Sequence, residues 1–264
     1  MPSRGGETMD VNSLLKKTID GFAACIAFYT RLPISFLAKE DTNFAEAQWA
    51  TPVVGLIVGL IGWVFFWLPA AFGLPPTISA AIALSIILGV TGCLHEDGVA
   101  DMTDAFGGGN TRERKLEIMK DSRNGTFGVV ALIMTLLLRW AAMAALLTPE
   151  IALFGLLAAH AGSRMLFPIF MHFVSPAKPT GLAAGIGTIS SDTALYAAII
   201  GGFVLLVCLG VWGALAAAFA LVVWFVAMKR LCERQIGGHT GDVLGSVQQG
   251  AEIILLLVAV ATLA

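Results

Sequence analysis

Three aspartates stand at helical spacing in the densest polar run of the sequence, at positions 97, 101 and 104. With about 3.6 residues per turn, Asp97, Asp101 and Asp104 fall within about 60° of one another on one helical face. Like charges at this spacing repel unless a cation neutralises them, and hard oxygen ligands suit Mg²⁺. We therefore predict a magnesium site here, with Glu96 as a further ligand or an outer partner. The alternative is a solvated helix end that is merely acidic.

A second polar run ends in a turn before Gly125. Lys120, Asp121 and Arg123 would offer a carboxylate and cationic groups there, together with backbone N–H groups that suit phosphate. Acidic and basic residues alternate along the preceding segment, 112–121. That alternation is equally typical of a surface helix with ion pairs between successive turns.

The third polar run, 237–245, is rich in glycine. Gly238 allows close backbone approach to a ligand, Thr240 offers a hydroxyl, and Asp242 could add another metal oxygen. A plain flexible loop is the competing interpretation.

The composition indicates whether water or lipid surrounds most of the chain. Of 264 residues, 57% are apolar and 13% are charged, about half the share of roughly 25% in soluble domains. The mean hydropathy is +0.84. These values exclude a disordered chain, a soluble enzyme and a disulfide-stapled secreted domain, and the net charge of −2 excludes a bulk nucleic-acid binder. The four cysteines form no CxxC motif and are interpreted as buried thiols. The chain is predicted to be an integral membrane protein.

Hydropathy predicts an all-α, polytopic bundle of about seven transmembrane helices in one domain, 1–264. The predicted spans are 52–68, 77–94, 127–147, 151–174, 194–209, 211–228 and 249–264. Residues 1–20 form a polar segment without a signal peptide. The following apolar stretch is too short to cross about 30 Å of hydrocarbon, so we expect residues 21–36 to form an interfacial or re-entrant helix.

The basic residues fix the predicted orientation. All Lys and Arg residues except Arg139 and Arg164 fall on the N-terminal segment and three long loops on the same side, whereas the opposite turns carry none. This bias predicts that the polar runs face the cytoplasm from the inner membrane. Arg139 and Arg164 lie inside predicted spans, where charges usually pair within the bundle. For Arg164 the partner is an acid or a substrate phosphate; for Arg139 a purely structural pairing is equally compatible.

Four ordered blocks give the sequence a family resemblance. Residues 96–104 with Gly107, Gly108 and Gly109, the block 116–125, the Thr-Arg-Leu-Pro at 30–33 and the block 237–245 resemble the signatures of the cobalamin synthase family, the adenosylcobinamide-GDP ribazoletransferases. The likeness spans nearly the whole chain. Two features depart from the family pattern: Ala105 replaces a common glycine, and residues 1–12 form an extension.

The resemblance implies a multi-pass, Mg²⁺-dependent enzyme of the last steps of vitamin B12 synthesis. Such enzymes join adenosylcobinamide-GDP to α-ribazole or its 5′-phosphate and release GMP. In that scheme the aspartates at 97, 101 and 104 hold Mg²⁺ on the pyrophosphate, and Asp121 and Asp242 complete the metal shell or act as general base. The cations that stabilise GMP are Arg123, Lys120 and Arg164, and the other residues assigned to substrate binding are Arg31, Gly107, Gly108, Gly109, Gly238 and Thr240.

Two other functions use similar residues. A cation-coupled transporter would place its acids near the bilayer midplane within internal repeats, and no repeat of the acidic block is visible. An enzyme like the CDP-alcohol phosphatidyltransferases would share the carboxylate chemistry, but its Ala-Arg after the first Asp-Gly is missing. We predict that the acids at 96–104, 121 and 242 converge in one cytoplasm-facing cavity.

Overall fold

The computed structural model describes residues 11–39 and 41–264, and within these ranges the chain is helical without named strands. The predicted all-α class is confirmed. The helices are α1 Val11–Tyr29, α2 Phe44–Ala47, α3 Thr51–Ala71, α4 Pro76–Thr91, α5 Leu94–Gly108, α6 Arg112–Ile118, α7 Thr126–Ala145, α8 Pro149–Arg164, α9 Leu166–Phe173, α10 Leu182–Ile186, α11 Ser191–Ile236 and α12 Gly241–Leu263, with short 3₁₀ turns at Ser35–Leu37 and Gln48–Ala50.

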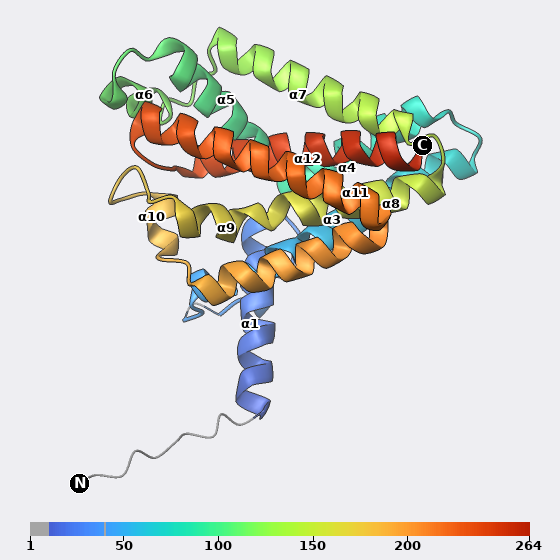
Figure 1. The fold of residues 1–264 in the computed structure, drawn as a ribbon, viewed down its shortest axis with the longest axis horizontal. Helices are drawn as coiled ribbons and strands as arrows, with labels where there is room; N and C mark the ends of the chain where they lie inside the picture. The colour runs from blue at the N-terminus through green and yellow to red at the C-terminus, as the bar shows by residue number, and fades with distance from the viewer. Residues whose placement is uncertain (1–10, 40) are drawn as a thin grey trace.

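The long helices form a bundle along one common direction (Figure 1). Five helices of the described residues are long and apolar enough to cross a membrane, or six if the bent pair α4–α5 counts as one span. α11 contains a break at Gly210, where φ is 67°, and Figure 1 shows the chain reversing direction there. Counting its two halves separately gives the predicted number of about seven. The chain is thus a polytopic membrane protein.

Two predicted spans have different boundaries in the structure. The span predicted at 77–94 is not continuous, because Gly92 and Cys93 adopt left-handed backbone angles and α5 leaves α4 at 86°. Glycine ends many helices in this conformation. The last helix begins at Gly241 rather than near residue 249, since the Thr240 hydroxyl accepts a hydrogen bond from the Val243 N–H and caps it. Asp242 therefore lies in a helix, not in a loop.

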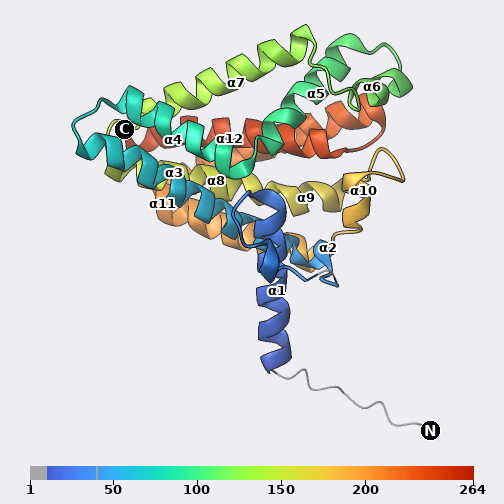
Figure 2. The same cartoon turned by 180° about the vertical axis from the view of Figure 1, so that it is seen from behind.

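α1 crosses the long helices at a steep angle in both views (Figures 1 and 2). It is absent from the candidate spans and ends at Tyr29, shortly before Pro33. The interfacial or re-entrant placement expected for residues 21–36 stays a prediction. The helix starts earlier than expected, because Val11–Asp20 of the predicted polar segment is also helical; residues 1–10 lie outside the described residues.

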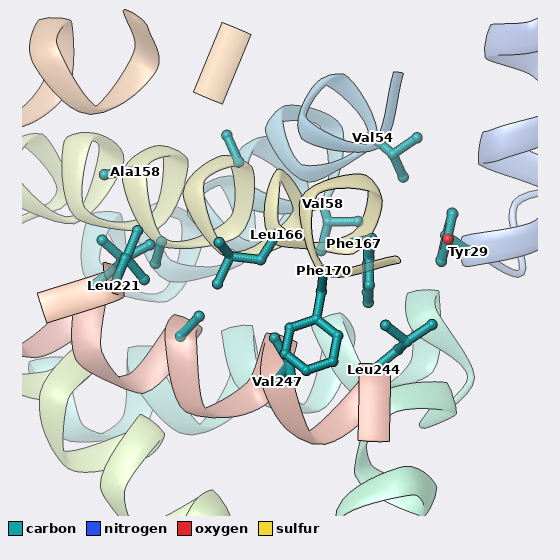
Figure 3. Packing of buried hydrophobic residues seen from close by; sticks show 14 of the residues in the cluster. Tyr29, Val54, Val58, Ala158, Leu166, Phe167, Phe170, Leu221, Leu244 and Val247 are labelled. Carbon is teal, nitrogen blue, oxygen red and sulfur yellow. The ribbon is translucent and has the colours of Figure 1, made fainter. Parts of the chain in front are cut away.

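Glycines let two helices of the core pack closely, and aromatic rings fill the space beside them. A β-carbon at Gly55 would lie 2.2 Å from the His160 carbonyl oxygen, so α3 and α8 make close backbone contact. Gly59 meets α8 one turn later, as the GxxxG spacing favours. Phe167 and Phe170 of α9 belong to the buried apolar cluster, and Figure 3 shows the Phe170 ring next to Val247 of α12.

Candidate functional site

Asp97, Asp101 and Asp242 come together where α5 packs against the start of α12. A β-carbon at Gly98 would lie 2.8 Å from the Asp242 carbonyl oxygen, and the Ser246 hydroxyl donates a 3.1 Å hydrogen bond to the Gly98 carbonyl. Asp97 is exposed, and Asp101 and Asp242 are half-buried. The Asp101 carboxylate experiences the negative charges of both other aspartates. We call these three residues the aspartate cluster.

Few positive groups compensate the negative charges of the aspartate cluster. Within the described ranges, the side chains of Asp97 and Asp101 have no hydrogen bond or ion pair, while Asp242 accepts a 3.1 Å bond from the Thr240 hydroxyl and experiences the charge of Lys178. Uncompensated carboxylates in a half-buried position suit a cation. No three His, Cys, Asp or Glu side chains in the described part of the chain are arranged to hold a metal. The cluster is thus not a preformed three-ligand metal site, and one or two of its carboxylates could hold Mg²⁺ only together with substrate phosphate and water.

Two of the predicted metal ligands, Asp104 and Glu96, have hydrogen-bond partners within the protein. The Asp104 carboxylate accepts hydrogen bonds from the Gly125 and Gly128 N–H groups, at 2.6 and 2.8 Å. It therefore caps the first turn of α7, whose N–H groups have no intrahelical acceptors. Glu96 Oε1 accepts bonds from Arg139 at 2.6 Å and Gln249 at 3.0 Å.

The predicted phosphate-binding turn lies at the surface. Asp121 accepts a 2.8 Å bond from Arg123 Nη2, and the Arg123 guanidinium lowers the pKa of the Asp121 carboxyl to about 2. Lys120 is exposed. The described contacts of Asp121 are with Arg123 rather than with the aspartate cluster, so the structure shows convergence for Asp97, Asp101 and Asp242 and not for Asp121. The turn still borders the cluster, since Met119 Sδ contacts the Thr240 hydroxyl at 3.8 Å.

The predicted substrate-binding glycines make close contacts with the protein itself. A β-carbon at Gly238 would lie 2.2 Å from the Ser175 carbonyl oxygen, so this loop packs on the segment after α9. At the end of α5, Gly107 lies against the Phe127 ring and Gly109 against Lys115. Gly107 and Gly108 are exposed and Gly109 is buried.

Arg31 has an exposed side chain that lies against Gly92, at the bend between α4 and α5. Its backbone N–H donates a 2.6 Å bond to the Val90 carbonyl. Its guanidinium therefore stands where the chain turns towards the aspartate cluster.

Glu252 is the centre of a buried ionic network that the sequence interpretation missed. Its carboxylate lies 2.8 Å from Arg139 Nη2, 3.2 Å from His160 Nδ1 and 3.9 Å from Arg164 Nη1. The buried charge network comprises Glu96, Arg139, His160, Arg164, Gln248, Gln249 and Glu252. Arg164 thus lies in the bundle interior and pairs with an acid, one of the two partners expected for it. Glu252 is an acid inside an apolar span, which by itself marks a residue with a specific role.

A cavity of about 160 Å³ adjoins the aspartate cluster, and we call it the aromatic cavity. Its polar lining consists of His95, Asp97 and Asp242, and its apolar lining includes Tyr29 and Phe167. A neighbouring cavity of about 170 Å³ contains Lys178 and shares Asp242. A larger groove of about 940 Å³ lies between α1, α2 and the start of α11.

Comparison with known proteins gives the family. The family model described as cobalamin-5-phosphate synthase matches residues 21–260. The chain belongs to this family. Adenosylcobinamide-GDP ribazoletransferase of Mesorhizobium japonicum is 48% identical over 244 residues, 92% of this chain and 94% of the relative. The enzymes of that name from Bradyrhizobium diazoefficiens and Azorhizobium caulinodans are 44% and 39% identical, covering 94% and 89% of this chain and 95% and 92% of their own. No solved structure matches this member of the cobalamin-5-phosphate synthase family.

Proposed function

We propose that this protein is a Mg²⁺-dependent transferase that joins adenosylcobinamide-GDP to α-ribazole or its 5′-phosphate and releases GMP. The family and the names of its relatives support the reaction. The observation that carries the site is the aspartate cluster, in which three carboxylates from two distant segments meet. Asp97 and Asp101 have no hydrogen-bond or ion-pair partner among residues 11–39 and 41–264.

The reaction is a displacement at phosphorus. A hydroxyl of the acceptor forms a P–O bond to the phosphate on the cobinamide side, the pyrophosphate P–O bond breaks, and GMP leaves with the electron pair. Mg²⁺, when bound, neutralises charge on the phosphate oxygens. One or two of the carboxylates of Asp97, Asp101 and Asp242 would hold it, and another of them would accept the hydroxyl proton.

The cations around the cluster suit the leaving group. Lys178 experiences the charge of Asp242, and Lys120 and Arg123 are exposed on the bordering turn. Positive side chains at this edge would stabilise the charge that develops on GMP. Since the other loops on this side also carry the basic residues, we propose that the site faces the cytoplasm from the inner membrane.

The test uses the full chain purified in detergent. Adenosylcobinamide-GDP and α-ribazole are supplied with Mg²⁺ or with excess chelator, and corrinoid product and GMP are measured together. We expect equal amounts of both products with Mg²⁺ and neither with the chelator. Equal turnover in both conditions would contradict the metal dependence. No product in either condition, with solute flux in proteoliposomes, would contradict the transferase and favour a transporter.

A further inference from the structure

The groove of about 940 Å³ between α1, α2 and the start of α11 is large enough for a bulky substrate, and we call it the α1–α11 groove. Pockets for small molecules usually measure about 300–1,000 Å³, whereas the two cavities at the aspartate cluster hold about 160 and 170 Å³. In the aromatic cavity, Tyr29 and His95 stack against Phe167, with ring centroids 5.0 and 5.4 Å away. These rings cover one another, so a bulky ligand must bind outside this cavity.

The walls of the α1–α11 groove combine apolar and hydrogen-bonding groups that a ligand can reach. Tyr196 and Ile199 of α11 line it and are 55% and 57% exposed. Trp49 adds a half-buried indole, and Asn43 and Ser190 are exposed polar residues of the lining. The groove therefore suits a ligand with an apolar face and a polar rim.

Acidic residues outnumber basic ones in the groove. Its charged lining consists of Asp20, Asp41, Glu46, Asp192, Lys16 and Lys17. Lys39 pairs with Asp20 at 2.5 Å and Lys17 with Glu46 at 2.5 Å, so four acids face three lysines and one negative charge remains in excess. A nucleotide or an anionic lipid head group would meet this excess, whereas a cationic ligand would be attracted by it.

The groove lies close to the aspartate cluster. α1 lines the groove at Gly21 and the aromatic cavity at Phe28, which are about 10 Å apart at 1.5 Å per helical residue. Ile186 at the end of α10 lines the same cavity, and Ser190 just after it lines the groove. In both views α10 lies between the starts of α11 and α12 (Figures 1 and 2). Since two aspartates of the cluster line the aromatic cavity, the groove and the cluster are neighbours.

We infer that the α1–α11 groove binds the corrin macrocycle of adenosylcobinamide-GDP. This inference rests on the proposed function. The macrocycle has an apolar face and a rim of neutral amides, and its cobalt centre makes the corrinoid part cationic. The arm that joins it to the phosphate has about eight bonds and reaches roughly 9–10 Å, given about 3.3–3.6 Å for three extended bonds. A corrin in the groove can therefore place its phosphate at the aspartate cluster.

Corrinoid binding without turnover tests this inference. Equilibrium dialysis on the purified full chain in detergent measures adenosylcobinamide, which lacks the phosphates, and separately GMP. Tyr196→Ala removes an exposed ring from the groove wall, and Phe203→Ala is the matched control because Phe203 is an exposed ring further along α11, outside the groove. We expect Tyr196→Ala to weaken adenosylcobinamide binding about tenfold and to leave GMP binding unchanged. Phe203→Ala should bind both ligands as the parent does.

The charge of the groove gives a second test. Asp192→Lys reverses an exposed acid of the groove in the first turn of α11, and Glu150→Lys reverses an exposed acid in the first turn of α8, outside the groove. Both changes act alike on their helix dipoles, so thermal unfolding should shift equally. We expect only Asp192→Lys to weaken adenosylcobinamide binding, by about fivefold. In turnover, Tyr196→Ala and Asp192→Lys should raise KM for adenosylcobinamide-GDP and leave kcat and the Mg²⁺ requirement unchanged.

Two results would overturn the inference. One is parental adenosylcobinamide affinity in both Tyr196→Ala and Asp192→Lys, and the other is an absence of adenosylcobinamide binding to the parent. Its failure is distinct from that of the proposed function, which is contradicted when no product forms or when product forms without Mg²⁺. Parental turnover and Mg²⁺ dependence with unchanged corrinoid binding in both variants would contradict the corrin site alone.

Discussion

Gly98 and Asp242 are in direct backbone contact, because a β-carbon at position 98 would lie 2.9 Å from the Asp242 Cα atom. α5 and α12 can therefore approach closely enough for Asp242 to join Asp97 and Asp101. Gly245 supports the same contact, with a β-carbon there lying 3.0 Å from the His95 carbonyl oxygen. The geometry of the site thus depends on Gly98 and Gly245, two glycines without a side chain that could take part in the reaction.

Gly98→Ala should separate the two helices by a fraction of an ångström to about 1 Å. A displacement of about 1 Å at a reacting site can cost about 10²-fold in rate, and we expect a loss of that order in product formed per folded protein. Gly89→Ala is the control, because a β-carbon at Gly89 meets no atom within 4 Å. Unchanged turnover in Gly98→Ala would show that the close contact is not needed.

Asp104→Asn tests the capping role of that carboxylate. The change weakens two hydrogen bonds to the first turn of α7, so the free energy of unfolding should fall by about 2 kcal/mol. Thermal unfolding in detergent measures this loss of stability. The control is Asp192→Asn at an exposed position, for which the free energy of unfolding should fall by about 0.5 kcal/mol or less. If Asp104→Asn instead kept full stability and required much more Mg²⁺ for turnover, Asp104 would be a metal ligand.

Glu252→Gln should be the most destabilising single charge removal in the bundle. The substitution leaves the buried guanidinium of Arg139 with Glu96 as its remaining acid and deprives Arg164 of its acidic partner. Breaking a buried ion pair from one side costs about 3–5 kcal/mol. The matched surface variant is Glu233→Gln, which removes the exposed pair with Lys229 and should cost below about 1 kcal/mol. Similar melting temperatures for the two variants would refute this role of Glu252.

His239 gives the stability a predictable pH dependence. Burial lowers the pKa of its imidazole to about 4 from an ordinary value of 6.5. Between these values the unfolded chain binds the proton and the folded chain does not, so stability falls as pH decreases from about 6.5 to 4. The His239 contribution is measured as the difference in melting temperature between the parent and His239→Gln across this window. His239→Gln should flatten that part of the profile; an unaltered slope would assign the effect to other groups.

The sequence predicted the class of the fold and part of the site. Hydropathy located the spans and the Gly210 break, since apolar length and glycine are local signals. The bend at Gly92 was missed because a left-handed Cys93 has no comparable local signal. Helical spacing grouped Asp97, Asp101 and Asp104 correctly on one face, but spacing carries no information about the neighbouring α7 N–H groups that bind Asp104.

The remaining differences between the predicted and the observed site depend on how separate segments of the chain meet in space. Asp242 lies with Asp97 and Asp101 as predicted, because Gly98 and Gly245 let α12 approach α5 closely, whereas Asp121 bonds its own neighbour Arg123. Glu252 was identifiable as an acid in an apolar span. His95, Tyr29 and Phe167 were not identifiable, because their stacking depends on how three separate helices meet.

The most direct test of the account is the turnover of Asp101→Asn across a Mg²⁺ titration. The substitution keeps the shape of the side chain, removes one of three mutually repelling charges, and should leave expression and detergent stability nearly unchanged. If the aspartate cluster holds Mg²⁺ on the reacting phosphates, turnover should fall about 10²–10³-fold, or about 3–4 kcal/mol in activation free energy, and half-maximal turnover should require more Mg²⁺. Parental turnover of Asp101→Asn at limiting Mg²⁺ would contradict the metal site.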